Sequence, residues 1–128
     1  MTDWDNKLNM AIEHIENNLC GDINFETISR ITLCPVDVLQ RFFVLNTGIT
    51  LTEYIRRRRL SEAAHTIIST NKKIIDIALE FGYETPDAFR VAFKRIFGVT
   101  PMEARKSKSI DNLYLRIAFS VTIYRLEE

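Results

Sequence analysis

The sequence is poor in the residues that build metal sites and hydrolytic centres. It has two cysteines and two histidines, and Cys20 and Cys34 belong to no cluster with the ligand spacing of a zinc site. We expect both to be reduced, partly buried thiols. His14 and His65 fall on separate predicted helices, and we expect His65 to be half-buried. With no Ser/His/Asp set and no glycine-rich phosphate loop, the sequence predicts a protein that is not an enzyme and needs no cofactor.

Long apolar segments are also absent. No run of about 18 apolar residues occurs, so no membrane-spanning helix is expected. The first ten residues, Met1–Met10, are acidic and lack the basic-then-apolar pattern of a secretion signal. We therefore expect a cytoplasmic protein that does not use a membrane as partner.

Neither sign of charge is in excess, because 17 basic residues balance 17 acidic ones. Their distribution is uneven, however. Residues 1–24 hold one basic and five acidic residues, whereas residues 25–108 hold 14 basic and 9 acidic residues. A uniformly basic nucleic-acid binder is excluded, but the basic middle of the chain is a candidate electrostatic footprint.

The chain is rich in helix signals. An amphipathic pattern runs from Trp4 to Leu19 with Gly21 as the expected stop, and Asn24 can cap a second, short helix. Proline residues open later helices, where their missing N–H costs nothing. The motif Thr-x-x-Glu, a capping box, occurs at Thr50 and again at Thr100. These signals predict an all-α fold.

Two parts of the chain repeat each other. Phe25–Val38 aligns with Ile74–Asp87 at an offset of 49, and Leu39–Glu53 aligns with Phe89–Glu103 at an offset of 50. Each copy reads as a short helix, a tight turn and a longer helix, which is the helix-turn-helix plan. The one-residue slip falls in or beside the turn, where an insertion is best tolerated.

A long helix is expected between the two copies, from Leu51 to Thr70, and it would be about 30 Å long. The major groove of DNA repeats about every 34 Å, so such a connector could hold two reading helices one turn apart. A plain helical bundle that happens to repeat is the alternative, because this geometry also occurs in proteins that do not bind DNA.

Two stretches, Leu39–Ile68 and Lys73–Arg105, give the sequence a family resemblance. The second is the more specific, with Phe-Gly-Tyr at 81–83, Phe-x-x-x-Phe-Lys at 89–94 and Gly-x-x-Pro at 98–101. The chain resembles the DNA-binding domain of the AraC/XylS family of bacterial transcription regulators. The resemblance implies one domain over residues 1–107, with helix-turn-helix units at about 24–48 and 74–98, a connector helix at 51–70 and a final helix at 100–107.

The resemblance also implies function. The partners would be double-stranded DNA and RNA polymerase, and the protein would be a sequence-specific regulator, with activation expected. The reading helices would be Pro35–Thr47 and Pro86–Phe97. The DNA-binding side chains expected on them, or next to them, are Val36, Asp37, Gln40, Arg41, Thr85, Asp87, Arg90, Val91, Lys94 and Arg95. Arginine and glutamine can pair with guanine and adenine edges, and Lys94 and Arg95 are expected to contact phosphates.

Some residues on the expected reading helices differ from those of a strongly basic DNA-binding protein. Asp37 and Asp87 would be unfavourable near phosphates unless they accept from a cytosine amino group, and their other interpretation is capping at a helix N-terminus. Val44 and Leu45 stand where basic residues are frequent in the family. The four arginines Arg56–Arg59 point in four directions, so some should pair internally with Glu53, Glu62 or Asp76. The large aromatic residues follow helical spacing and are expected in the core.

Residues 108–128 belong to neither copy. From Leu113 to Ile123, apolar and polar residues alternate, which favours a β-strand, although a helix is also possible. The segment resembles the first strand of the gyrase-inhibitor-like effector domain that follows in many relatives. A lone strand leaves backbone groups unpaired, so pairing between two copies, a homodimer through residues 110–126, is one expected outcome. A protein-interaction module acting through this tail is the alternative function.

Overall fold

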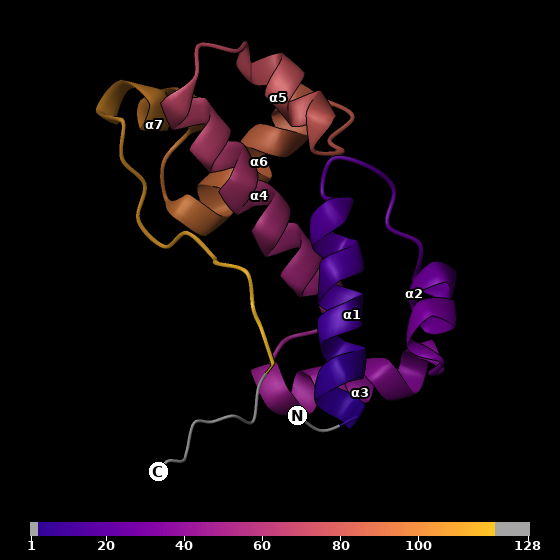
Figure 1. The fold of residues 1–128 in the computed structure, drawn as a ribbon. Helices are drawn as coiled ribbons and strands as arrows, with labels where there is room; N and C mark the ends of the chain where they lie inside the picture. Colours follow the sequence, from indigo (N-terminus) through magenta and orange to yellow (C-terminus); the bar gives the residue numbers. More distant parts are fainter. Residues whose placement is uncertain (1–2, 120–128) are drawn as a thin grey trace. The chain divides into compact units, whose positions relative to one another are not determined.

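The computed structural model describes residues 3–119, and within this range the chain forms seven α-helices (Figure 1). They group into two compact units. Among the described residues, the first unit contains residues 3–18, 23–54 and 116–119, and the second contains residues 19–22 and 55–115. The helices are α1 (Asp3–Asn17), α2 (Phe25–Thr32), α3 (Val36–Thr47), α4 (Leu51–Ser69), α5 (Ile74–Glu80), α6 (Pro86–Phe97) and α7 (Pro101–Ser107).

These bounds agree closely with those expected from the sequence. The largest difference is at α1, which ends at Asn17 instead of continuing to the glycine at 21. A second difference is at α3, where Pro35 is the residue before the helix, in an extended conformation, and not its first turn. No helix in residues 3–119 combines the length and the apolar character needed to cross a bilayer.

The first unit is built on the apolar face of α1. The buried residues of α1 recur at helical spacing, and α1 packs on α2, which packs on α3. The buried core residues of this unit come from these three helices and the first turn of α4. They are Leu8, Ala11, Ile12, Ile15, Ile28, Leu39, Phe43, Leu51 and Tyr54. At the start of α1, Trp4 stacks on Phe42 of α3 with ring centroids 3.8 Å apart. Lys7 Nζ donates to the Thr32 carbonyl at 2.6 Å and so satisfies a carbonyl at the end of α2.

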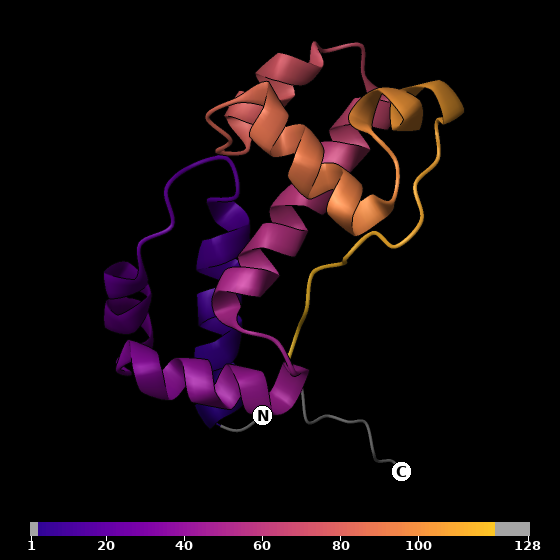
Figure 2. The same ribbon diagram turned by 180° about the vertical axis from the view of Figure 1, so that it is seen from behind.

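The second unit has its own core between α4, α5, α6 and α7 (Figure 2). A row of rings runs along α6, with Phe89, Phe93 and Phe97 buried and Tyr83 packed edge-on against Phe89. This confirms that these aromatic residues are core residues and not platforms for bases. His65 is exposed, so the expectation that it is half-buried is wrong.

The two helix-turn-helix turns close in the same way. Cys34 N–H donates to the Ser29 carbonyl at 3.1 Å, and Tyr83 N–H donates to the Ala78 carbonyl at 3.0 Å. The residue before each donor is left-handed, with φ 54° at Leu33 and φ 90° at Gly82. Both second helices then end on a left-handed glycine, Gly48 or Gly98. Because α3 and α6 have equal length and equivalent ends, the extra residue lies in the second turn itself, and the two helices align at an offset of 50 throughout.

Side-chain caps fix four helix starts. Asn24 accepts from two backbone N–H groups at the start of α2, and Thr85 accepts from Ala88 N–H at 3.1 Å. At α7 the complete capping box is present, since Thr100 and Glu103 each accept from the other's backbone N–H. At α4, Thr50 accepts from the Glu53 N–H at 3.0 Å. The predicted helix starts therefore rest on the predicted side chains.

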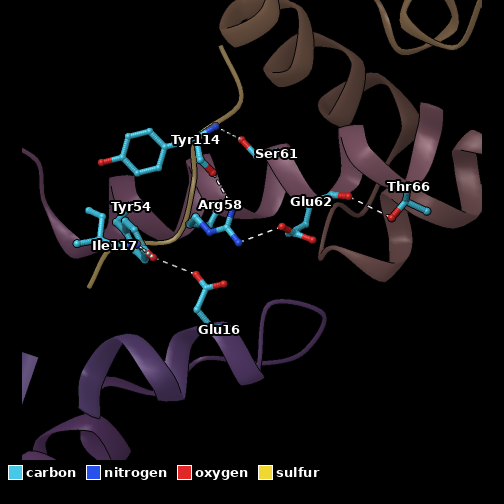
Figure 3. A network of polar contacts seen from close by, with 8 residues as sticks. All are labelled: Glu16, Tyr54, Arg58, Ser61, Glu62, Thr66, Tyr114 and Ile117. Carbon is cyan, nitrogen blue, oxygen red and sulfur yellow. Dashed lines mark hydrogen bonds and ion pairs between the residues drawn. The ribbon is translucent and has the colours of Figure 1, made fainter. Parts of the chain in front are cut away.

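The described part of the tail, residues 109–119, contains neither helix nor strand. The expected strand is thus not formed there, and its remaining residues lie outside the described range. The physical reason is that no second strand is available in residues 3–119 to complete a ladder. Side chains take that role instead. In the second unit, Ser61 Oγ accepts from Tyr114 N–H at 2.8 Å and Arg58 donates to the Tyr114 carbonyl at 2.6 Å (Figure 3).

Candidate nucleic-acid interface

The outward face of α3 carries four of the expected DNA-binding residues. Leu39 and Phe43 fix the orientation of the helix because they are completely buried. Asp37 and Arg41 are consequently exposed, while Val36 and Gln40 are partly exposed. Asp37, Gln40 and Arg41 line a shallow surface hollow together with Val44 and Leu45. The first unit therefore presents polar and apolar groups side by side on one helix face.

The outward face of α6 carries the corresponding set in the second unit. Phe89 and Phe93 anchor this helix, and Asp87, Arg90, Val91, Lys94 and Arg95 are all exposed. Thr85 is exposed as well, directly before the helix, and its hydroxyl oxygen already caps α6. A hydroxyl that accepts one hydrogen bond still has its own proton to donate. The outward face of α6 therefore presents hydrogen-bond donors and positive charges to solvent.

An acidic residue and an arginine pair on each of these faces. Asp37 lies 3.8 Å from Arg41, and Asp87 lies 3.7 Å from Arg90. All four side chains are more than half exposed, so each ion pair contributes little stability. Neither aspartate is the residue that caps its helix, because Pro35 and Thr85 hold those positions. Each aspartate lies in the first turn, where the helix dipole favours a negative charge, and it orients an arginine one turn further on.

The two faces differ further along the helices. Lys94 and Arg95 on α6 are replaced at the equivalent positions of α3 by Val44 and Leu45. Val44 is 39% exposed and Leu45 is 81% exposed. A polyanion would thus meet two cations on one helix and two apolar side chains on the other. We expect α6 to supply more of the phosphate attraction.

The arginine run on α4 is divided between structural and exposed roles. Arg58 is 6% exposed, and besides the tail carbonyl it bonds Glu62 at 3.0 Å. Arg59 donates to the carbonyls of Leu19 and Gly21 at 3.0 and 2.6 Å. These contacts confirm that part of the run pairs internally, and that one partner is Glu62.

The other two arginines of the run act on tyrosines of the second unit, Arg57 by contact and Arg56 through its charge. The Arg57 guanidinium sits 5.4 Å from the centre of the Tyr114 ring. Burial raises the pKa of the Tyr83 hydroxyl above its ordinary value, while the positive charges of Arg56 and Arg59 oppose this shift. Sequence reasoning did not assign either tyrosine, because a cation over a ring depends on tertiary packing.

No group of three or more His, Cys, Asp or Glu side chains in the described range is arranged to hold a metal ion. Among the same residues, Cys20 and Cys34 are free thiols, Cys20 exposed and Cys34 buried. The chemistry available on α3 and α6 is therefore hydrogen bonding, charge and apolar contact. These are the means by which proteins read a duplex.

Comparison with known proteins identifies the family. The profile of a family described as helix-turn-helix domain matches residues 28–107. The transcriptional activator AarP of Providencia stuartii is 38% identical over 93 residues, which cover 73% of this chain and 69% of AarP. The regulatory protein SoxS of Salmonella typhimurium is 36% identical over 94 residues, covering 73% of this chain and 88% of SoxS.

Solved structures agree with this assignment. The crystal structure of a transcriptional regulator from Chromobacterium violaceum, of the proteins that contain an AraC-type DNA-binding domain, superimposes with a TM-score of 0.76 at 25% identity. That match covers 81% of this chain and 93% of the other. The family profile ends at residue 107, and the interpretation of the tail as part of an effector domain is not confirmed. The chain belongs to the AraC family of DNA-binding transcription regulators.

Proposed function

We propose that the chain reads double-stranded DNA with two helices, α3 and α6, each placed in the major groove. The observation that carries this proposal is the repetition of one exposed arrangement at an offset of 50: aspartate in the first turn and a long polar side chain three residues later. Asp37 is followed by Gln40, and Asp87 is followed by Arg90. Both arrangements lie on the second helix of a helix-turn-helix unit, which is the reading helix of that motif.

Each side chain then has a chemical role. Gln40, Arg41 and Arg90 read base edges by hydrogen bonding, and Val36 and Val91 offer apolar contact to a thymine methyl group. Thr85, Lys94 and Arg95 contact phosphates. Asp37 and Asp87 orient the arginines that they pair with, and each can also accept from a cytosine amino group.

Activation of transcription in the bacterial cytoplasm, through contact with RNA polymerase, is the proposed outcome of DNA binding. It is supported by the similarity to AarP, a transcriptional activator, and by the resemblance to AraC/XylS regulators. A reporter gene placed behind a selected site tests the sign. Lower expression with the protein present than without it would make the chain a repressor.

Self-association through residues 110–126 is a further proposal. It would require the tail to leave the side chains that hold residues 114–119 in this chain and to find equivalent ones on a second copy. Light scattering over a wide range of protein concentration decides the question. A single monomer mass throughout that range would exclude the dimer.

A protein-interaction module is the second candidate function, and the exposed Val44 and Leu45 favour it. These side chains place apolar surface on α3 where α6 carries cations. The salt dependence of duplex binding separates the two candidates. A DNA reader loses affinity steeply as salt increases, by about 0.9 in log–log slope for each phosphate contact, whereas an apolar protein contact does not.

Selection from a random pool of duplex DNA tests the main proposal. We expect the retained fraction to carry a site with two fixed blocks about 10 base pairs apart, one for each reading helix. One fixed block alone would restrict reading to a single unit. Retention without any fixed block would mean that the chain binds DNA without reading it, and would overturn the proposal.

A further inference from the structure

Residues 116–119 lie against a small site on the first unit that recognises backbone. We call the three side chains that form it, Asn9, Phe43 and Tyr54, the tail seat. They come from α1, α3 and α4 respectively. The tail residues that occupy the seat lie beyond the segment matched by the family profile, which ends at residue 107.

The Asn9 side chain pairs with one residue as a neighbouring β-strand would. Its Nδ2 donates to the Phe119 carbonyl at 2.6 Å, and its Oδ1 accepts from the Phe119 N–H at 2.7 Å. A carboxamide has the donor and acceptor of a peptide group, so it can satisfy both backbone groups of one residue. One side chain thus replaces the missing strand at this position.

Tyr54 and Phe43 complete the seat. The Tyr54 hydroxyl accepts from the Ile117 N–H at 3.2 Å and donates to Glu16 at 3.0 Å (Figure 3). The Phe119 ring meets Phe43 edge-on, with centroids 6.0 Å apart. Phe43 and Tyr54 are completely buried and pack against each other. Phe43 belongs to α3, so the tail touches the inner side of the first candidate reading helix.

We propose that residues 116–119 are an intramolecular ligand of the tail seat, and that occupancy of the seat determines how firmly α3 is held. The hydrogen bonds recognise backbone, and the Phe119 ring supplies the apolar contact. When the tail leaves, an edge of the aromatic cluster behind α3 is uncovered and the helix loses part of its support. Any consequence for DNA reading rests on the proposed function, but the docking itself does not.

Amide hydrogen exchange of the full chain, followed residue by residue by NMR without DNA, tests the proposal. Three variants weaken the seat: Asn9→Ala, Tyr54→Phe and Phe119→Ala. Asn9→Ala removes both hydrogen bonds and introduces a better helix former, so folding is retained. We expect exchange at Ile117 and Phe119 to become about tenfold faster in Asn9→Ala. We also expect faster exchange at the buried α3 amides, with α6 unchanged.

Two control variants make similar substitutions at residues that do not belong to the tail seat. Asn6→Ala changes the same residue type on the same helix at an exposed position, and Leu115→Ala removes a tail side chain that is 75% exposed. Both should leave the exchange rates as in the wild type. Unchanged exchange at Ile117 and Phe119 in Asn9→Ala would overturn the docking. Faster exchange of the tail with no change in α3 would overturn the link to the reading helix, and protection that rises with protein concentration would assign the tail to a second copy.

Whether the proposed function fails is measured separately. Selection from random DNA can give no fixed site while the exchange pattern of the tail seat remains as expected. In that case the docking of the tail is supported, and the proposal that α3 reads DNA is rejected. The reverse result, a fixed site with unprotected tail amides, would leave DNA reading in place and reject the tail seat.

Discussion

At the scale of single residues, Arg57 and Arg58 show how adjacent positions on one helix acquire different roles. Arg58 is almost fully buried and bonds both Glu62 and the Tyr114 carbonyl, whereas Arg57 is partly exposed and covers the Tyr114 ring. One helical position, a rotation of about 100°, separates them. The sequence predicts that some arginines of this run are structural, but the choice among them depends on the rotation of α4 within the second unit.

Arg58→Ala should destabilise the chain by about 2–4 kcal/mol, because it removes charge-assisted hydrogen bonds from a buried position. Arg57→Ala should cost less, because the Arg57 side chain is only partly buried and remains in contact with solvent. Urea titration of both variants measures the difference. Equal losses in the two variants would mean that burial of Arg58 does not determine its contribution.

Arg90→Ala should reduce binding to the selected site more than binding to random duplex, because we assign Arg90 to base reading. The expected loss of discrimination is about 1–3 kcal/mol. Competition titrations with selected and random duplexes measure it. Asp87→Ala is the informative companion, since it frees Arg90 from its acidic partner and removes a negative charge near phosphates. If Arg90→Ala lowers the affinity for the selected and the random duplex equally, Arg90 contacts phosphates instead of bases.

At the scale of elements, the two helix-turn-helix turns contain different residues at the same left-handed position. Gly82 suits this conformation, whereas Leu33 adopts φ 54° with 83% of its surface exposed. A residue with a side chain in this region loses about 1–2 kcal/mol of folding free energy relative to glycine. Part of this difference is offset because glycine loses more conformational entropy on folding.

Leu33→Gly should therefore stabilise the chain by about 0.5–1 kcal/mol, an unusual direction for the removal of a leucine. Thermal unfolding gives the sign directly. The converse change, Gly82→Leu, should destabilise the chain, since φ is 90° there and a residue with a side chain rarely adopts that backbone conformation. Destabilisation by Leu33→Gly would show that the exposed leucine makes contacts that outweigh its backbone strain.

The capping box of α7 predicts a pH dependence. The hydrogen bonds from the backbone and side chain of Thr100 lower the pKa of Glu103 below its usual value, so the folded chain binds this proton more weakly than the unfolded chain. The ionised cap therefore stabilises the fold above the ordinary carboxyl range, and this contribution is lost as the pH falls through the lowered pKa.

Glu103→Gln keeps the geometry of the cap but cannot ionise. The melting temperature of the wild type should exceed that of Glu103→Gln near neutral pH, and the difference should shrink as the solution is acidified. Thermal scans at several pH values check this. A difference that stays constant across the acid range would show that the charge of Glu103 contributes nothing.

At the scale of the whole molecule, the parts that could be predicted from sequence are those set by local chemistry. Gly48, Gly98 and the Thr100 box fixed helix ends, and the buried spacing of Phe89 and Phe93 oriented a reading helix. The tail could not be predicted in this way. Alternation shows that a segment suits an extended conformation, but it cannot show that Asn9, 110 residues earlier, takes the place of a partner strand.

The uneven charge of the two reading helices makes a prediction for the molecule as a whole. Val44→Lys together with Leu45→Arg would copy the cations of α6 onto α3. We expect tighter binding to every duplex and a salt slope steeper by up to about two units. Lys94→Ala should flatten the slope by about one unit. Binding measured from low to high salt checks both, and a slope unaffected by the α3 substitutions would place that end of α3 away from phosphates.

The difference between α3 and α6 has one more consequence. A dimer of identical readers recognises a palindrome, which looks the same from either end. Here one reader offers Gln40 and Arg41 where the other offers Arg90 and Val91, and both belong to one chain. Under the proposed function, a site read by both helices has no two-fold symmetry, so the bound protein would have a single orientation along the duplex. Reversing the site would reverse the orientation of the bound protein. Transcription of a gene on one side of the site could then be regulated while a gene on the other side is not.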